Sequence, residues 1–521
     1  MPADGELWYS AGPDRMPELK RVLVANRGEI ALRIIRACHE EGLEAVAVYS
    51  DADRLSPHVR AANLAVHLGA APASESYLNI PKLIKAAKDT GCQAVHPGYG
   101  FLSERAPFAA AVRDAGLTFI GPTPEAIKAM GDKTEARRRM QQAGVPIVPG
   151  LTTPLKDAAE AAREARRIGF PVLFKAAAGG GGKGMRLVRS AAEAESAFEG
   201  ARSEAQKAFG DGAVYIEKYI EQPRHIEIQI LGDTHKRVVA VGERECSIQR
   251  RHQKLIEESP SVAVTPALRR RMGDAATAAA GSVGYVGAGT IEFLLASNGE
   301  FYFLEMNTRI QVEHPVTELV YGVDLVREQL RIAMGQPMRI HRGALEPRGH
   351  AIECRITAED PFNGFLPATG VVKYLRVPAG PGVRWDGGVE AGNEVTLHYD
   401  PLIAKLIVWG ENRETALARL RRALRELVIV GLPTSQAFHL RVLADPDFRS
   451  GAIDIGYLDR KGEALLSAPL SDALVKPVAV VEAMLAEERR SGGMAGGGRS
   501  EESPSGSPWL QAARREGIGR E

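Results

Sequence analysis

A predicted hairpin around Asn298-Gly299 carries side chains that could bind hard cations. Two β-rich runs flank this pair, which is a strong signal for a two-residue turn. Counting from the turn places Glu292 directly opposite Glu305, and the two-residue period of a strand puts Asn307 on the same face. Opposed carboxylates repel each other, whereas Mg²⁺ binds carboxylate and amide oxygens together with nucleotide phosphates. The segment therefore predicts a site for divalent cations.

Charged and amide side chains follow this hairpin directly. Arg309, Gln311, Glu313 and His314 come within a few residues of the predicted cation site. A strand that supplies metal ligands and then such side chains indicates a reaction centre. The alternative is a solvated outer face of a hairpin, which the bulky apolar residues at alternate positions of the strands disfavour.

A glycine-rich segment between two predicted strands could wrap phosphate groups. The strand 170–175 ends in Lys175, and the sequence AAAGGGGKGM follows it as far as Met185. Glycine lets backbone N–H groups approach phosphate oxygens, and Lys175 and Lys183 supply positive charge. The pattern is not GxxxxGK[ST] and precedes a strand, so a Walker-type NTPase is disfavoured. A flexible linker is the alternative, but a mobile phosphate-covering lid fits the flanking strands better.

Two further segments predict the walls of a nucleotide cleft. The predicted strand 213–220 has Glu217 and Lys218 near its end, where they could hydrogen-bond a nucleobase. The run 246–254, CSIQRRHQK, is almost wholly polar although strand patterns flank it. Such runs are usually surface loops, but this density of Gln, His and Lys beside a metal-binding hairpin favours a segment that lines a cleft.

The elements that position these side chains belong to an α/β fold. In the N-terminal part we expect strands at 22–25, 45–49, 64–68 and 94–96 and helices at 30–41 and 77–90. This alternation predicts a parallel sheet with helices on both faces. No GxGxxG follows the first strand, so dinucleotide binding is not indicated. The segment HPGYGF, from His96, follows a strand end where open α/β sheets bind ligands, although it could equally be a rigid turn.

A second sheet-rich region begins at residue 349. Arg355 lies on a strand of alternating character, and its guanidinium cannot deprotonate, so it is paired with a carboxylate or directed at an anion. Residues 1–17 read as a disordered leader, and residues 461–521 as a tail with helical and disordered stretches.

Composition excludes several functional classes. The 521 residues include 66 Lys and Arg against 65 Asp and Glu, so there is no electrostatic case for nucleic acid or an anionic membrane. Four widely spaced cysteines without CxxC pairs fit reduced thiols. Neither a signal peptide nor a long apolar run is found, so we expect a cytoplasmic protein.

The motifs together resemble the ATP-grasp ligases, and among them the biotin carboxylases, from about residue 20 to about residue 460. The matching sequences, in order, are VLVANRGEIALRIIRA, HPGYGFLSE, MGDK, GGGGKGM, EKYI, PRHIEIQ, CSIQRRHQK, EMNTRIQVEHPVTE, GHAIECRI and DPLIAKLI. The resemblance implies an α/β (α+β) fold with three domains: a Rossmann-like N-terminal domain at 18–130, an ATP-grasp domain at 131–345 with a lid at about 147–219, and a sheet-rich C-terminal domain at 346–460.

The resemblance also implies the reaction and its participants. Biotin on a carrier protein would be carboxylated with ATP and bicarbonate by way of carboxyphosphate, as the first half-reaction of an acyl-CoA carboxylase such as acetyl-CoA carboxylase in fatty acid biosynthesis. Two Mg²⁺ or Mn²⁺ ions would assist. Biotin carboxyl carrier protein and carboxyltransferase subunits would act in trans, since no lysine here is flanked by methionines. A homodimer is expected.

Family roles carry over where the motifs match. The residues expected to bind ATP are Lys133, Lys175, Gly181, Gly182, Met185, Glu217, Lys218, Ile220, His225, Gln249 and His252. Those expected to bind the two cations are Glu292, Glu305 and Asn307. Those expected around bicarbonate and biotin are Tyr99, Lys254, Arg309, Gln311, Val312, Glu313 and Arg355, of which Lys254, Arg309, Glu313 and Arg355 would be catalytic.

Chemistry supports two of these roles. Glu313 would remove the proton of bicarbonate, and Arg355 would stabilise the enolate-like form of biotin. Two departures from the family pattern, Ala178 and the segment 104–107, are expected to leave the chemistry untouched. The alternatives are a carboxylate–amine or carbamoyl-phosphate-type ligase and a catalytically idle ATP-binding subunit. The four catalytic side chains argue against both.

Overall fold

The computed structural model describes residues 19–151, 153–176, 185–209, 211–251, 253–340 and 345–467. The predicted leader at 1–17, most of the predicted tail, and Gly181, Gly182 and His252 of the predicted nucleotide site lie outside these residues. Within them, no helix combines the length and the apolar character that crossing a membrane requires.

The N-terminal part is a parallel sheet with helices, as predicted. The strand order is β3 (Leu64–Gly69), β2 (Glu44–Ser50), β1 (Arg21–Val24), β4 (Ala94–His96) and β5 (Thr118–Phe119). The helices are α1 (Gly28–Glu40), α2 (Pro57–Ala61), α3 (Ile80–Asp89), α4 (Ala106–Asp114) and α5 (Pro124–Gly131). Helix α3 begins three residues later than predicted, because Asn79 caps it by accepting a hydrogen bond from the Lys82 amide at 3.1 Å.

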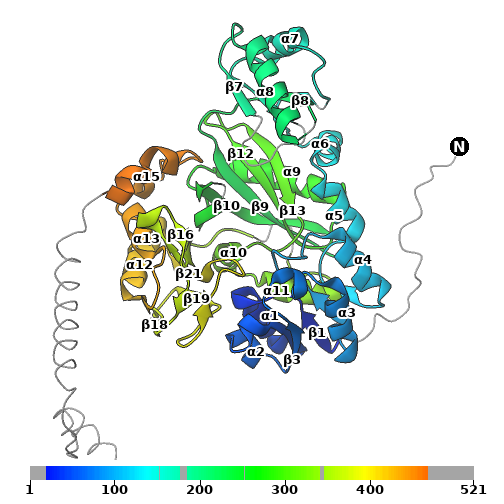
Figure 1. Cartoon of the computed structure of the whole chain (residues 1–521), viewed down its shortest axis with the longest axis vertical. Coiled ribbons are helices and arrows are strands. Elements are labelled where there is room, and N and C mark those ends of the chain that lie inside the picture. The colour runs from blue at the N-terminus through cyan, green and yellow to red at the C-terminus, as the bar shows by residue number, and fades with distance from the viewer. Residues whose placement is uncertain are drawn as a thin grey trace, which may run out of the picture. The chain divides into compact units, whose positions relative to one another are not determined.

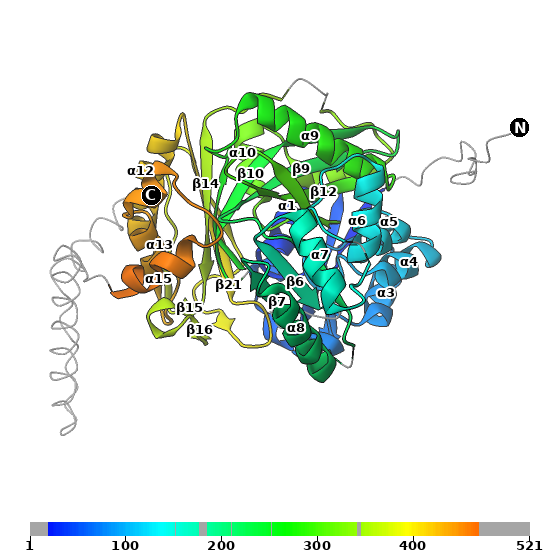
Figure 2. The ribbon, with the colours of Figure 1, turned by 90° about the horizontal axis from the view of Figure 1, so that it is seen from above.

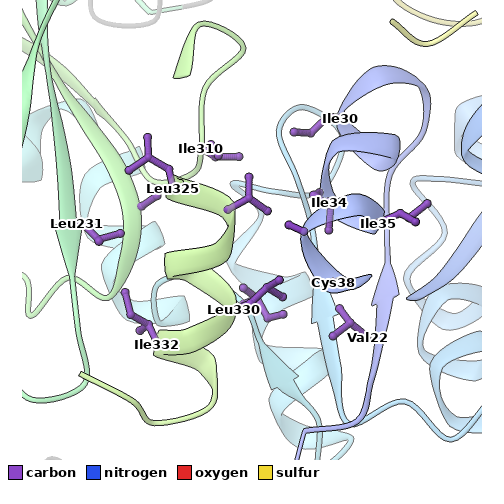
Figure 3. Packing of buried hydrophobic residues seen from close by; sticks show 14 of the residues in the cluster. Val22, Ile30, Ile34, Ile35, Cys38, Leu231, Ile310, Leu325, Leu330 and Ile332 are labelled. Atoms are coloured by element: carbon purple, nitrogen blue, oxygen red, sulfur yellow. The ribbon is translucent and has the colours of Figure 1, made fainter. Parts of the chain in front are cut away.

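Helix α1 joins this part to the rest of the chain through an apolar interface. Its buried face packs against α11 (Leu325–Ala333) in one hydrophobic cluster. Figure 3 shows the facing side chains, among them Ile34 and Cys38 of α1 and Leu330 of α11. Such burial stabilises the fold by about 1.5–3 kcal/mol for each large side chain. The interface therefore holds α1 near the site described below.

An antiparallel sheet of eight strands, built from both the middle and the C-terminal parts of the chain, carries most of the candidate site. Its order is β13 (Phe301–Asn307), β12 (Gly287–Leu295), β9 (Arg224–Gly232), β10 (Val238–Arg250), β11 (Gln253–Ser259), β14 (His350–Thr357), β21 (Leu402–Gly410) and β19 (Val383–Gly387). Strands β11 and β14 pair directly, with Ile256 opposite Cys354. One sheet therefore runs across residue 345, where the sequence predicts the end of a domain.

A smaller sheet carries part of the predicted nucleotide site. Strand β6 (Val172–Ala176) pairs on one side with β7 (Met185–Val188) and on the other with β8 (Val214–Lys218). Helices α7 (Ala158–Ile168) and α8 (Ala194–Phe209) pack on each other and on this sheet (Figure 1). Their apolar faces enclose Phe174 and Phe198, which pack edge to face.

The remaining helices cover the large sheet. Helices α12 (Arg413–Glu426) and α13 (Gln436–Val442) lie beside β14 and β21 (Figure 2). The others are α6 (Lys133–Gln142), α9 (Pro266–Gly281), α10 (His314–Tyr321), α14 (Pro446–Ser450) and α15 (Tyr457–Ser467). Three two-stranded ribbons complete the described part: β15 (Glu359–Asp360) with β16 (Leu366–Pro367), β17 (Gly370–Val371) with β20 (Glu394–Val395), and β18 (Tyr374–Arg376) with β22 (Val428–Val430).

Candidate active site

The β12–β13 hairpin brings two glutamates face to face. Glu292 pairs with Glu305, and Thr290 pairs with Asn307, so the predicted register is confirmed at the site. The two-residue turn is wrong, because the Ala296 amide donates to the Glu300 carbonyl at 2.8 Å and leaves three residues in the loop. Gly299 has φ +82° and makes this longer loop possible. A bulge after Glu292 then shifts the register back, so the pairing of the two glutamates survives.

Glu292 is saturated with hydrogen-bond donors. Its Oε1 atom accepts from Asn307 Nδ2 at 2.9 Å and from Gln311 Nε2 at 2.8 Å. Lys254 Nζ lies 2.9 Å from the same oxygen, and His225 Nε2 lies 2.8 Å from Oε2. Burial alone would raise the pKa of Glu292, but the charges of Lys254 and His225 outweigh it and hold the pKa well below its usual range. Glu292 is therefore ionised.

Lys254 connects three buried carboxylates. Its Nζ atom lies 2.6 Å from Glu227, 2.9 Å from Glu292 and 2.7 Å from Glu313. Burial opposes the charged ammonium, yet these carboxylates raise the pKa of Lys254 well above its usual value. A permanent cation thus stands at the centre of the site.

Glu313 lies between two cations. One carboxylate oxygen accepts from Lys254 Nζ at 2.7 Å, and the other accepts from Arg355 Nη2 at 2.9 Å. Burial disfavours the charge, but Lys254 and Arg355 lower the pKa of Glu313 well below its usual range. The side chain is fixed at the N-cap position of α10, directly after the segment that leaves β13. This arrangement holds an ionised carboxylate in a dry, cationic setting.

A fully buried arginine that the sequence analysis missed supports these side chains. Arg244 donates to Glu227 at 2.5 Å and to Gln311 at 2.6 Å. It also donates to Gln229, Thr290 and Thr317 at 2.7–3.0 Å. The sequence offered one signal for Arg244: charged residues stand at inward positions of strands 226–231 and 238–250. A charge that is buried at such a position needs a partner.

Arg309 is held by a residue that the sequence analysis dismissed. Glu104 accepts from Arg309 Nε at 2.8 Å and from the Thr308 amide at 3.0 Å. Arg309 Nη2 also donates to Asn307 Oδ1 at 2.9 Å. The segment 104–107 was expected to leave the chemistry untouched; its first residue contacts Arg309, an expected catalytic side chain, and the expectation about the chemistry stays a prediction. The contact spans 205 residues of sequence, so no local pattern reveals it.

Tyr99 and Val312 belong to a second buried network beside this centre. The Tyr99 hydroxyl donates to Glu29, and Glu29 lies 3.2 Å from Lys405 Nζ. Lys405 in turn donates to the Val312 carbonyl at 2.8 Å. Glu29 and Lys405 were not predicted, although Lys405 lies in the matched segment DPLIAKLI.

The predicted nucleotide residues fall into two groups. Lys175 pairs with Glu217 on the three-stranded sheet, and Arg137 of α6 lies 3.5 Å from the same glutamate. The Lys218 ammonium donates to the carbonyls of residues 169 and 170, so it is bound within the protein. Met185 is exposed on β7, and Ile220 follows β8.

The second group lies on or near the large sheet. Gln249 pairs with Lys254 across β10 and β11, so the described part of the polar run 246–254 lies mostly at the end of β10 and the start of β11. His225 contacts Glu292 as described above. Lys133 begins α6, whose N-cap Asp132 accepts from two backbone amides. The charge of Lys133 partly offsets the burial and the Glu292 charge that raise the pKa of Glu305. Lys133 thus lies on the cation side of the site.

Three family profiles match the chain in succession. "Biotin carboxylase, N-terminal domain" matches residues 18–127, "Carbamoyl-phosphate synthase L chain, ATP binding domain" matches 132–341, and "Biotin carboxylase C-terminal domain" matches 353–460. Together they span most of the chain. The chain belongs to the biotin carboxylase family.

Curated relatives and solved structures agree with this family. The biotin carboxylase of Nostoc sp. is 54% identical over 438 residues, which cover 84% of this chain and 98% of the relative. The biotin carboxylase of Haemophilus influenzae is 52% identical over 444 residues, covering 85% and 99%. The biotin carboxylase domain dimer of Hydrogenobacter thermophilus 2-oxoglutarate carboxylase, solved with MgADP, ADP and bicarbonate, has a TM-score of 0.79 at 47% identity, covering 87% and 99%. A biotin carboxylase complex from Campylobacter jejuni has a TM-score of 0.78 at 47% identity, covering 85% and 99%.

The oxygen atoms of Glu292, Glu305 and Asn307 fit a divalent cation. Loss of hydration and then the charge of Glu292 raise the pKa of Glu305, so a cation between the two would relieve a real repulsion. Among the described residues, no lysine, arginine or histidine forms an ion pair with Glu305. A hard cation with oxygen ligands matches the carboxylates of Glu292 and Glu305 and the amide oxygen of Asn307.

Proposed function

We propose that this chain catalyses the ATP- and bicarbonate-dependent carboxylation of biotin presented by a carrier protein, the first half-reaction of an acyl-CoA carboxylase. One observation carries the proposal. Glu313, an ionised carboxylate, accepts hydrogen bonds from Lys254 at 2.7 Å and from Arg355 at 2.9 Å beside the Glu292–Glu305 pair. The middle profile alone would also suit a carbamoyl-phosphate-type ligase, but the flanking biotin carboxylase profiles disfavour it.

The first step needs a base beside a cation. Bicarbonate becomes a competent nucleophile when its proton passes to a Glu313 oxygen. A bicarbonate oxygen then forms a bond to the γ-phosphorus of ATP, and the bond from that phosphorus to ADP breaks, which gives carboxyphosphate and ADP. Lys254 and Arg309 supply positive charge where the two anions meet. The low pKa of Glu313 ensures that the base is ionised before the substrate arrives.

The nucleotide and the divalent ions have separate ligands. Glu292, Glu305 and Asn307 would hold Mg²⁺ or Mn²⁺, which neutralise phosphate charge when bound. Side chains expected at ATP are Lys133, Lys175, Met185, Glu217, Ile220, His225 and Gln249. Because the Lys218 ammonium is bound to two backbone carbonyls, we assign its nucleotide contact to the backbone.

The second step needs a fixed cation for biotin. Carboxyphosphate releases CO₂ and phosphate, the biotin ureido nitrogen passes its proton to that phosphate, and a nitrogen–carbon bond to CO₂ forms. Negative charge then develops on the ureido oxygen, and Arg355 stabilises it. The Arg355 guanidinium remains charged because Glu257 and Glu313 raise its pKa despite burial.

Partners follow from the same chemistry. We infer that the carrier and the carboxyltransferase are separate subunits, because no lysine of this chain is flanked by methionines. We also infer a homodimer, in line with the dimer described for the Hydrogenobacter thermophilus domain. A streptavidin blot that detects biotin on this chain would refute the first inference, and a monomer in light scattering would refute the second.

Substrate dependence tests the proposed function. ATP cleavage by the purified chain with Mg²⁺ should require bicarbonate and should rise when free biotin is added. Phosphate release with and without each substrate measures this. Dependence on ammonia or an amino acid in place of bicarbonate would instead establish another ATP-grasp ligase, and the absence of any turnover would establish an idle ATP-binding subunit.

A further inference from the structure

Two buried glutamates face each other directly behind Arg355. Glu257 of β11 is opposite Glu353 of β14 in the antiparallel register, and both side chains are fully buried. Like charges at directly opposed positions destabilise a sheet, and burial away from water makes an unpaired charge costly. A second pair of opposed acids therefore lies in this site, in addition to Glu292 and Glu305.

The hydrogen bonds of this pair are unequal. Glu257 Oε1 accepts from Arg355 Nε at 2.6 Å. Glu257 Oε2 and both carboxylate oxygens of Glu353 are buried and have no hydrogen-bond partner among the described residues. A fully ionised pair would leave three charged oxygens unsatisfied, which buried carboxylates do not tolerate.

The surrounding charges do not compensate for two ionised glutamates. Four groups act on Glu353 from the elements around it: Lys405 of β21, Glu257 of β11, Arg355 of its own strand, and Glu313 at the start of α10. Lys405 Nζ is already bound to the Val312 carbonyl at 2.8 Å and to Glu29 at 3.2 Å. Arg355 is shared between Glu257 and Glu313. Lys254, whose charge also acts on Glu257, is shared among Glu227, Glu292 and Glu313, so Lys405, Arg355 and Lys254 all have other anionic partners.

We propose that Glu257 and Glu353 share one proton, and that this proton lets Arg355 face Glu313 and biotin. With one negative charge on the pair, Glu257 Oε1 lies 2.6 Å from both Nε and Nη2 of Arg355, and Nη2 still reaches Glu313 at 2.9 Å. Loss of the proton would place two carboxylates behind Arg355 and draw it away from the substrate side. Burial raises the pKa of Glu257 to about 7 and the pKa of Glu353 well above its usual range, which agrees with a bound proton at neutral pH.

This inference deepens the proposed function by naming two positioning residues, and its first test needs no turnover. Infrared difference spectra of the full chain between neutral and strongly alkaline pH should show the carbonyl band of a protonated carboxylic acid in wild type. Glu353→Gln should lower the intensity of that band, because the amide mimics the neutral acid but cannot titrate. Glu258→Gln is the matched control. Glu258 follows Glu257 on β11 and is also buried, but it bonds His350 and Arg413 and not Arg355. A band of unchanged intensity in Glu353→Gln overturns the proposal.

The second test separates positioning from a structural role. In wild type, biotin-stimulated ATP cleavage should fall at alkaline pH as the shared proton is lost. In Glu353→Gln that alkaline fall should move to higher pH, with the neutral-pH rate within about threefold of wild type, whereas Glu258→Gln should keep the wild-type profile. A Glu353→Gln profile identical to wild type, in a variant that unfolds cooperatively, overturns the proposal. If Glu353→Gln fails to fold, Glu257→Gln replaces it. This variant removes the carboxylate that accepts from Arg355, so loss of biotin stimulation without loss of the biotin-independent rate is expected. Equal loss of both rates would overturn it.

Discussion

Glu305 lies directly opposite Glu292 across the β12–β13 hairpin, yet only Glu292 has cationic partners among the described residues. The donors around Glu292 keep it ionised, and its charge raises the pKa of Glu305. An additional cation would therefore bind most favourably beside Glu305.

Glu305→Gln should therefore weaken the response to divalent ions. The variant should need about tenfold more Mg²⁺ for half-maximal ATP cleavage, because one carboxylate ligand is lost. A Mg²⁺ titration of phosphate release measures the change. Glu300→Gln at the tip of the same hairpin, where Glu300 contacts Asn298 and Tyr302, is the control and should behave as wild type. An unchanged Mg²⁺ requirement in Glu305→Gln would remove Glu305 from the cation site.

If Glu313 is the base, as proposed, Glu313→Gln should abolish bicarbonate-dependent ATP cleavage with or without biotin, because the amide cannot take the bicarbonate proton. We expect a loss of about a hundredfold or more, whereas binding of the metal–nucleotide complex should persist. Phosphate release and nucleotide binding, measured on one preparation, distinguish the two effects. Normal biotin-stimulated turnover would show that another group is the base.

Arg355→Ser should separate the half-reactions. The slow biotin-independent cleavage of ATP should largely remain, because the guanidinium is proposed to act later, on the charge that develops on biotin. Stimulation by biotin should disappear, with a loss of about a hundredfold. The ratio of rates with and without free biotin is the measurement. Equal loss of both rates would contradict this division of roles.

Glu104→Gln should impair the use of bicarbonate through Arg309. The variant breaks the ion pair at 2.8 Å and leaves Arg309 with its contact to Asn307. We expect KM for bicarbonate to rise about tenfold, by analogy with the loss of one charged hydrogen bond, and the thermal midpoint to change little. Glu125→Gln, which removes a surface pair with Arg113, is the control. A normal KM in Glu104→Gln would reduce the ion pair to a structural contact.

Acid should destabilise the large sheet through Glu258. Burial opposes its charge, but hydrogen bonds and charges from His350 and Arg413 lower the pKa of Glu258 to about 2. Because the folded-state pKa lies below the unfolded value of about 4.5, this contribution is present above pH 4.5 and is lost as pH falls toward 2, and it amounts to about 3 kcal/mol. Urea unfolding between pH 5 and pH 3 should show a steeper loss of stability in wild type than in Glu258→Gln. Parallel curves would contradict this assignment.

Local patterns in the sequence determined the elements and one key pairing. The alternation of strand residues places Glu292, Glu305 and Asn307 on one face, and the helix predicted at 30–41 lies at Gly28–Glu40. The turn was misjudged by one residue, because whether a loop holds two or three residues depends on Gly299 and on a bulge that compensates for it. The two-residue period of a strand does not reveal a bulge that offsets a longer loop.

Only the tertiary structure decided what surrounds the reacting groups. Lys254 reaches Glu227, Glu292 and Glu313, and Arg309 reaches Glu104, through contacts between segments far apart in the chain. The pairing of β11 with β14 places Glu257 opposite Glu353, although the two residues belong to parts of the sequence that were predicted to be separate domains. Propensity and period describe a strand by itself. Burial and charge balance depend on which strand becomes its neighbour, and that is set by the packing of the whole sheet.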